Sequence, residues 1–301
     1  MEVSLSFVNF FSSHALSEKP KLHITPMSGN PVAGRLDIVE STLFSYVYSV
    51  VGDDGKTVLK ARELWCEGKQ HDVRPFGDES VLLNEARIYT ALGDHPHIVK
   101  FHGLEQVALN VHALRLERSH IGAVRKYVLD HPAEPPAVAC RLRMALDFAE
   151  AISHCHARGV RCGDFSTRNA LLFDGLRVKL CDFGAATLEG TEYEPFQCYE
   201  VRYQLPARGR DEGEVPRMVE ELFALGSAVH EVMEWHVPFL DVPEHELEGL
   251  YADDRLPVLA ADNPAAEVIR KCWYEEYESA GQVVDELQCL LDGLVKMPTQ
   301  S

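Results

Sequence analysis

The stretch from Val160 to Ala185, V-R-C-G-D-F-S-T-R-N-A-L-L-F-D-G-L-R-V-K-L-C-D-F-G-A, constrains the fold of this chain more than any other part. It is typical of a short β-hairpin. Leu171-Leu172 begins one strand, Asp174-Gly175 is a turn signal, and Val178 and Leu180 lie on the returning strand. We therefore predict two antiparallel strands here, with a loop before the first and another after the second.

Polar side chains stand on both of these loops. Asp164 and Asn169 precede the hairpin, and Asp182 follows it directly. Because the two ends of a hairpin lie next to each other, we expect these groups to meet at one place. Two carboxylates and a carboxamide suit a hard divalent cation and the phosphates that such a cation carries.

The rest of the chain divides into a β-rich part followed by a helix-rich part, which predicts the α+β class. Residues 1–34 mix Ser, Pro, Gly and Lys without a sustained period, and we predict a flexible extension there. Strand signals run from Leu36 to Leu64, and we interpret Cys66–Asp78 as a polar loop. A folded domain over residues 35–293 and a short tail over 294–301 complete this division.

Helical spacing of apolar residues marks the elements outside the hairpin. Leu82, Ala86 and Tyr89 form the buried stripe of a helix that stops near Gly93. Further helices are predicted from four other sets of residues: Leu142 to Ile152, Leu222 to Met233, Ala265 to Trp273, and Ala280 to Leu291.

Composition limits the classes of partner. The net charge of −18 argues against binding to nucleic acid or to an anionic membrane and favours a basic protein or peptide partner. The eight cysteines contain no C-x-x-C pair, which favours free thiols in a reducing, intracellular compartment, cytoplasmic or nuclear. We find no signal peptide and no apolar run of the ~18 residues that a membrane span needs.

An acid five residues before an Asn, followed by D-F-G, resembles the catalytic and metal loops of protein kinases. The resemblance extends over residues 36–292, because further kinase-like motifs occur in the expected order. It implies a two-lobed fold, with a β-rich N-lobe over about residues 35–116 and a helical C-lobe over about 117–293. It also implies ATP and Mg²⁺ as cofactors and a protein hydroxyl as the phosphate acceptor.

The resemblance assigns roles residue by residue. Lys60, in V-L-K, is similar to the lysine that holds the α- and β-phosphates, and Glu85 to the helix glutamate that pairs with it. Asp164 resembles the catalytic base, whereas Asn169 and Asp182 resemble the metal ligands. Arg168 would meet the γ-phosphate. The residues that would line the nucleotide site are Val39, Val47, Val58, Leu116, Glu117 and Leu171.

The chain also departs from the family pattern. Glu40, Thr42 and Ser45 stand where the phosphate-covering loop carries glycines, and Glu40 would add negative charge near the phosphates. The usual H-R-D is Cys162-Gly163-Asp164, so the Arg that gathers an activation-segment phosphate in many kinases is missing. We therefore expect any activity to be independent of phosphorylation in that segment.

Two further motifs differ. Leu205-Pro206-Ala207 replaces A-P-E and lacks its acid, and Tyr277–Gly281 lacks the arginine that usually pairs with this acid. We expect both halves of that ion pair to be lost. Glu221 replaces the usual Asp of the central helix.

Three functions remain open from the sequence. The first is a protein kinase, with Ser/Thr acceptors favoured over Tyr although Ser166 stands where Ser/Thr kinases carry Lys. The second is a pseudokinase that binds or scaffolds. The third is a small-molecule phosphotransferase, because the G-D-x-x-x-x-N form at Gly163–Asn169 is also similar to aminoglycoside and choline kinases.

Overall fold

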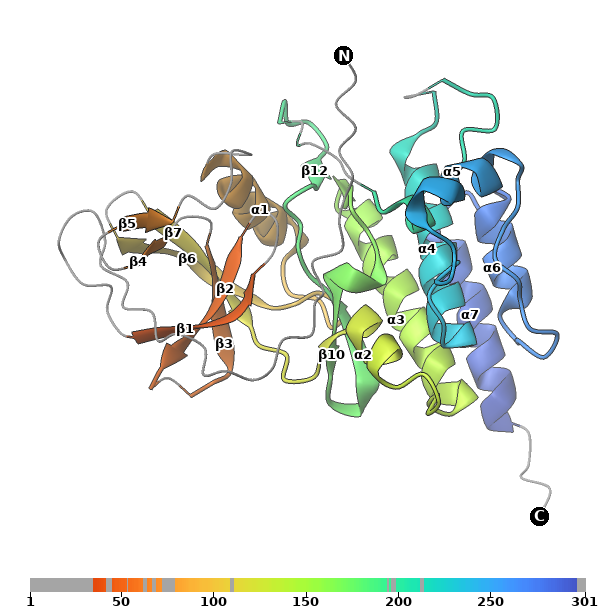
Figure 1. Cartoon of the computed structure of the whole chain (residues 1–301), viewed down its shortest axis with the longest axis horizontal. Helices are drawn as coiled ribbons and strands as arrows, with labels where there is room; N and C mark the ends of the chain where they lie inside the picture. Colours follow the sequence, from red (N-terminus) through yellow and green to blue (C-terminus); the bar gives the residue numbers. More distant parts are fainter. Residues whose placement is uncertain are drawn as a thin grey trace.

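The computed structural model describes residues 35–41, 45–52, 54–61, 64–66, 69–71, 79–108, 111–193, 195, 199–211 and 214–296. Within these residues the chain has a β-rich N-terminal lobe and a helical C-terminal lobe, which lie at opposite ends of the long axis in Figure 1. The predicted α+β class and two-lobed architecture are confirmed. The predicted extension over residues 1–34 lies outside the described residues, as do residues 42–44 of the predicted phosphate-covering loop.

A five-stranded antiparallel sheet forms the N-lobe, in the order β1-β2-β3-β7-β6. Its strands are β1 (Arg35–Ser41), β2 (Tyr46–Val51), β3 (Thr57–Ala61), β6 (Phe101–Ala108) and β7 (Val111–Glu117). Side chains alternate between the two faces of a strand. Val58 and Lys60 therefore share one face of β3 and pair with Leu116 and Leu114 of β7. The other face is covered by a small separate cluster containing Tyr48 and Leu59.

Helix α1 (Glu79–Leu92) packs against β6 and β7 of this sheet. The predicted stripe of Leu82, Ala86 and Tyr89 is buried, and the helix ends before Gly93 as predicted. Gly93 has a left-handed backbone, with φ of 65°, which closes the last turn by donating its N–H to the Tyr89 carbonyl at 3.0 Å.

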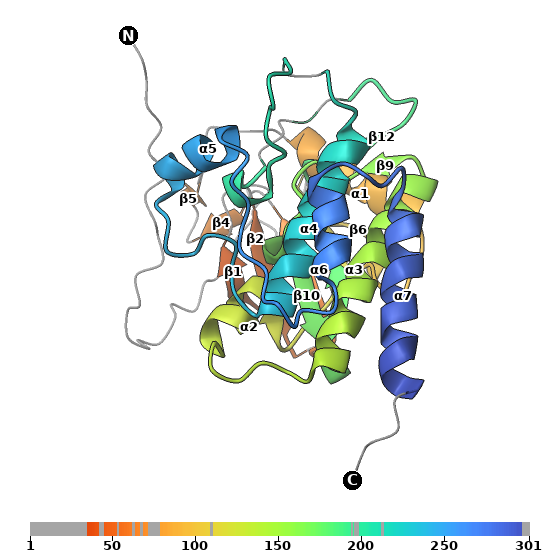
Figure 2. The same ribbon diagram turned by 90° about the vertical axis from the view of Figure 1, so that its right-hand side faces the viewer.

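The C-lobe is built on four helices that lie side by side in Figure 2. Helix α3 packs against α4 and α7, and α4 packs against α6. Their bounds are α3 (Val138–Ala157), α4 (Arg217–Glu234), α6 (Ala266–Trp273) and α7 (Ala280–Lys296). All four predicted helices are confirmed, and α7 continues past residue 293, where the sequence placed the start of a tail.

One glycine sets the distance between two of these helices. A Cβ atom built on Gly226 of α4 would stand 2.5 Å from the Cβ of Cys272 in α6. Only a residue without a side chain permits this approach. Helix α4, which is buried from Glu221 to Met233, thereby packs closely against α6.

Two helices and one hairpin were not predicted. Helices α2 (Val124–Asp130) and α5 (Glu244–Ala252) are short, and each buries only two residues, too few for a clear period. The prediction of a polar loop over Cys66–Asp78 is wrong in part, because β4 (Leu64–Cys66) and β5 (Lys69–His71) form a small antiparallel pair. Strands of only three residues are too short to show an alternating pattern.

The predicted hairpin is confirmed as β10 (Ala170–Phe173) and β11 (Arg177–Leu180). The short strand β8 (Gly122–Ala123) extends it, and a second small pair joins β9 (Val160–Arg161) to β12 (Thr187–Leu188). The segment after α1 attaches to this region, because Val99 donates its N–H to the Leu180 carbonyl at 2.9 Å. The hairpin therefore lies where the two lobes meet, and it carries the loops of interest.

Across the described part of the chain, no helix combines the length and the apolar character that crossing a membrane requires.

Candidate active site

A buried lysine joins the two lobes at the centre of the candidate site. The Lys60 Nζ lies 2.8 Å from both carboxylate oxygens of Glu85 and 2.8 Å from Oδ1 of Asp182. Strand β3, helix α1 and the loop after β11 each contribute one member of this triad. The pKa of Lys60 is raised, because the attraction of Asp182 and Glu85 outweighs burial. One cation between two carboxylates leaves a negative charge for a further cation to balance.

Asp182 is held in its position by the backbone around it. Its φ of 60° lies in the left-handed region, which a non-glycine residue adopts only where its surroundings fix it. The Phe183 N–H donates to Glu85 Oε1 at 3.2 Å, and Tyr89 of α1 meets the Phe183 ring edge-on at 5.1 Å. Helix α1 and the D-F-G segment are therefore fixed to each other.

Asp164 and Asn169 lie beside the triad, as the sequence predicted. They line one small pocket together with Asp182 and Phe183. The Asn169 side-chain amide donates to Oδ2 of Asp164 at 3.0 Å, whereas Oδ1 of Asp164 is buried without a hydrogen-bond partner in the described part of the chain. Burial raises the pKa of Asp164 to about 7, and the Asp182 carboxylate contributes to the rise.

This donor set fits a divalent metal ion. Asp182 offers a carboxylate and Asn169 a carboxamide on the same pocket, and hard oxygen donors are what Mg²⁺ prefers. Partial burial opposes ionisation of Asp182, but Lys60 lowers the pKa of this carboxyl, so that it is ionised at neutral pH. The assignment of Asn169 and Asp182 as metal ligands and of Asp164 as the base remains a prediction.

The predicted nucleotide-lining residues divide into two groups. Val58 and Leu116 are buried in the main core, and Val47 and Leu171 are half-buried against it. These four residues come from β2, β3, β7 and β10 and bring apolar surface to the junction of the lobes. Val39, in β1, is instead 36% exposed.

Glu117, the last residue of β7, directly follows Leu116. Its side chain is turned to Lys179 of β11, with Nζ at 2.6 and 2.8 Å from the two carboxylate oxygens. The carboxylate is thus engaged within the protein. A contact of Glu117 with a nucleotide would therefore use its backbone.

The loop that carries Asp164 is anchored by a residue of the central helix. Glu221 of α4 is completely buried, and its carboxylate accepts hydrogen bonds from the backbone N–H groups of Cys162 and Gly163 and from His156. The longer acid found here in place of Asp still reaches the loop. The loss of His and Arg before Asp164 therefore leaves this anchor in place.

Arg168 is half-exposed, and its Nη2 lies 3.8 Å from Oδ1 of Asp164. A closer contact joins Arg168 to Glu200 in the segment after the D-F-G motif, with 3.1 Å between Nε and Oε2. Ser166 is fully buried, and its hydroxyl therefore does not stand at the surface where a substrate would bind. Sequence reasoning did not single out Glu200, because its partners are distant in the sequence.

Both halves of the usual A-P-E ion pair are absent, as the sequence indicated, but an ion pair of opposite polarity that was not predicted follows the motif. Arg208 and Arg210 follow the L-P-A motif, and each lies 2.6 Å from a carboxylate oxygen of Glu275, between α6 and α7. The acid and the base have exchanged places. The sequence was examined only for an arginine after α6, and the pairing of an acid at this place with two arginines was therefore missed.

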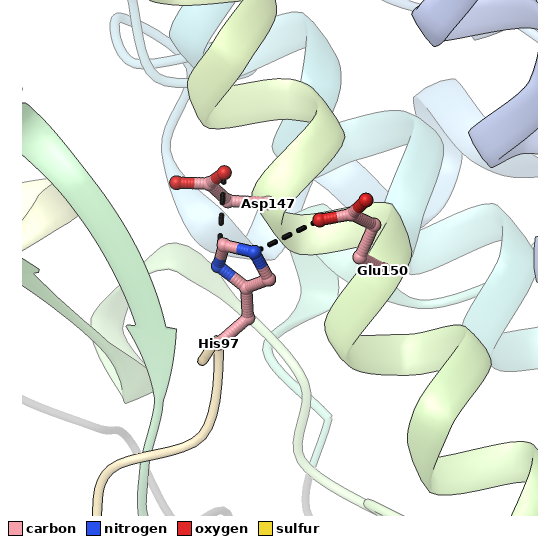
Figure 3. Close-up of side chains that lie close together, drawn as sticks. All are labelled: His97, Asp147 and Glu150. Carbon is pink, nitrogen blue, oxygen red and sulfur yellow. Dashed lines mark ion pairs between the residues drawn. The ribbon is translucent and has the colours of Figure 1, made fainter. Parts of the chain in front are cut away.

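Outside this pocket lies a second polar cluster, drawn in Figure 3, in which His97 faces the buried Asp147 and the partly exposed Glu150 of α3. These residue types can ligate metals, and His97 Nε2 lies 2.8 Å from Glu150. A guanidinium already supplies the positive charge, because Arg177 binds both oxygens of Asp147 at 2.8 and 2.9 Å and approaches His97 Nε2 at 3.3 Å. We interpret the cluster as an ion-pair network that fastens the loop after α1 to α3 and the hairpin.

A two-lobed fold with a Lys–Glu–Asp triad at the lobe junction defines a phosphotransferase-like architecture of the kinase type. Comparison with known families is more specific. Residues 73–285 match the family described as protein tyrosine and serine/threonine kinase. The chain belongs to this family, which confirms the resemblance to protein kinases.

Curated relatives agree in class. The chain is 26% identical over 218 residues to the serine/threonine/tyrosine-protein kinase HT1 of Arabidopsis thaliana, covering 66% of this chain and 53% of that protein. It is 28% identical over 213 residues to serine/threonine-protein kinase 12 of the same plant, covering 68% and 44%. A probable LIM domain-containing serine/threonine-protein kinase of Dictyostelium discoideum is 25% identical over 247 residues, covering 76% and 37%. The chain thus spans about half or less of the length of these relatives.

Proposed function

We propose that this chain is an active protein kinase that transfers the γ-phosphate of ATP to a protein hydroxyl with the help of Mg²⁺. The observation that carries the proposal is the triad of Lys60, Glu85 and Asp182, with all its contacts at 2.8 Å and with the two lobes joined through it. Phosphoryl transfer needs positioned phosphates, neutralised charge and an oriented hydroxyl rather than covalent help from the protein.

Each residue then has a defined task. The apolar surface of Val58 and Leu116 would receive the adenine. Lys60 would bind phosphate oxygens, and these would replace part of its present contact with Asp182. Asn169 and Asp182 would hold Mg²⁺, which neutralises the charge of the phosphates when bound. Asp164 would accept the proton of the acceptor hydroxyl through Oδ1, which has no hydrogen-bond partner among the described residues. A pKa of about 7 suits a group that takes up a proton near neutral pH.

Ser/Thr acceptors are favoured over Tyr. The names of the relatives support this preference, since they are serine/threonine kinases or a serine/threonine/tyrosine kinase. The net charge of −18 favours a substrate or binding partner with basic side chains around the acceptor hydroxyl. The absence of C-x-x-C pairs favours an intracellular location, cytoplasmic or nuclear.

A pseudokinase is the second candidate, and Glu40 is the observation that favours it. This exposed acid of β1 stands where the phosphate-covering loop carries glycine, and it is near enough to Cys181 for its charge to contribute to the raised pKa of that thiol. Cys181 directly precedes the metal-binding candidate Asp182. A carboxylate there opposes the binding of triphosphate by like-charge repulsion.

Thermal unfolding with ATP, in Mg²⁺ and in EDTA, distinguishes the two candidates, because a ligand that binds the native state stabilises it by mass action. We expect a larger shift with Mg²⁺, and we expect Asp182→Asn to remove the Mg²⁺-dependent part. Asp174→Asn, at an exposed turn, is the matched control. Phosphate transfer to a basic test protein by the parent, lost in Asp164→Asn, completes the test. Mg²⁺-dependent binding without transfer would favour the pseudokinase, and no nucleotide binding at all would contradict the proposed activity.

A further inference from the structure

Glu200 lies in the segment after the D-F-G motif, and its carboxylate is shared by two arginines. Arg125 of α2 donates Nη1 to Oε1 at 2.9 Å and Nη2 to Oε2 at 3.3 Å. Arg168 of the catalytic loop approaches Oε2 from its own side, with Nε at 3.1 Å. The Glu200 side chain is only 7% exposed, so that it is enclosed by these partners rather than solvated.

Arg125 of α2 is itself held in place by residues of the C-lobe core. Its Nε donates to Glu231 of α4 at 2.6 Å and to Thr167 at 3.1 Å. Tyr203, three residues after Glu200, donates its hydroxyl to the other oxygen of Glu231 at 2.8 Å. The segment around residues 200–203 is thus attached to the C-lobe core at two neighbouring points.

Charge balance explains why a carboxylate is needed at this position. Arg125 and Glu231 are almost fully buried, and Glu200 and Arg168 add one charge of each sign beside them. Without the charge of Glu200, the buried guanidinium of Arg125 keeps only one carboxylate partner, Glu231. A buried charge that loses its partner is far costlier than the intact pair.

The same contact bears on catalysis. Other kinases use an arginine directly before the catalytic Asp to gather a phosphate on this segment, and Gly163 occupies that position here. We propose that Glu200 is a positioning residue that replaces the phosphate: its permanent carboxylate fixes the segment to the catalytic loop and holds Arg168 beside Asp164. The role in transfer rests on the proposed function, whereas the attachment of the segment does not.

The experiment measures hydrogen exchange of the backbone amides over residues 199–205 in the full chain after phosphatase treatment. The variants are Glu200→Gln, Arg168→Gln and the double variant, with Glu192→Gln as the matched control. Glu192 is an exposed acid of the same segment. Arg168 is half-exposed, so its variant tests the contact even if Glu200→Gln does not fold.

We expect exchange at these amides to accelerate about tenfold or more in Glu200→Gln, because local opening becomes easier when the attachment is lost. Glu192→Gln should exchange at the parent rate. The effects of the Glu200→Gln and Arg168→Gln substitutions on exchange should be non-additive, because the two residues share one contact. The double variant should therefore exchange only a little faster than the faster of the two single variants. Glu200→Asp, which keeps the charge on a shorter stem, should recover part of the protection.

Kinetics give the second readout. If the parent transfers phosphate, Glu200→Gln should lower kcat by about tenfold with little change of KM for ATP, because it displaces a group beside the base rather than the nucleotide. Parent-like exchange in Glu200→Gln, or loss of protection in the parent on phosphatase treatment, would overturn the attachment. Accelerated exchange with unchanged kcat would overturn the positioning role. An inactive parent with accelerated exchange in Glu200→Gln would contradict the proposed function and leave the attachment established.

Discussion

The Asp164→Asn variant should be more stable than the parent at and above neutral pH, although it should lose phosphate transfer. Burial raises the pKa of the Asp164 carboxyl to about 7, and the side chain is only 27% exposed. The native state therefore prefers the protonated carboxyl. The unfolded chain ionises it near the ordinary value of 3.8.

The sign of the effect follows from this difference. A carboxyl whose pKa is raised in the native state contributes stability that is complete below its unfolded pKa and is lost as the pH rises through the folded pKa. This difference costs the native state about 2 kcal/mol at about pH 5.5, where the unfolded chain has released the proton and the native state keeps it. The cost is about 4 kcal/mol at about pH 8, where the native carboxyl is ionised as well. Asn cannot ionise and can still accept the hydrogen bond from Asn169, which is 3.0 Å from Oδ2.

The assay is urea unfolding of the parent, Asp164→Asn and the exposed-turn control Asp174→Asn, in EDTA and without nucleotide. We expect the stability gain of Asp164→Asn over the parent to grow by about 2 kcal/mol between about pH 5.5 and about pH 8, with unchanged dependence on urea concentration. The control should show no such growth. A gain that is independent of pH, or one that shrinks as the pH rises, would refute the argument that Asp164 is a buried carboxyl held near its neutral form.

Three further predictions concern packing and charge. Gly226→Ala should lower the free energy of unfolding by about 3 kcal/mol in urea unfolding, because its Cβ would overlap Cys272; Gly249→Ala in α5, with open space around it, should instead be neutral or stabilising, and equal effects would contradict this account. Glu275→Gln should cost about 1–2 kcal/mol, less at high salt, since it leaves two arginines without their carboxylate; a salt-independent loss in the same unfolding assay would be against it. Val58→Ala should lower stability by about 1 kcal/mol yet preserve or raise nucleotide affinity in calorimetry, because it widens the proposed adenine site; a steep fall in affinity would contradict this account.

The sequence was most informative where the determinants are local. A turn signal between two apolar pairs predicted the β10–β11 hairpin, and the hairpin alone explains why Asp164, Asn169 and Asp182 meet. The buried face of α1 could be predicted from its period. That Glu85 lies on this face and reaches Lys60 came from the family resemblance rather than from the period itself.

Contacts between distant segments could not be predicted. Glu200 is joined to Arg125 across 75 positions of the chain, and no local pattern marks either residue as a partner of the other. The reversed ion pair of Arg208 and Glu275 could not be predicted for the same reason. A charged residue in a loop is usually solvated, and only its surroundings in the folded chain reveal that it is not.

The exchanged ion pair has a consequence for how pieces of this domain can be combined with those of its relatives. A hybrid that carries the L-P-A segment of this chain and the α6–α7 loop of a relative with the ordinary arrangement would place Arg208 and Arg210 against an arginine. The reciprocal hybrid would place Glu275 against the acid of A-P-E. Because like charges then meet where an ion pair should form, the two segments can be transplanted only together.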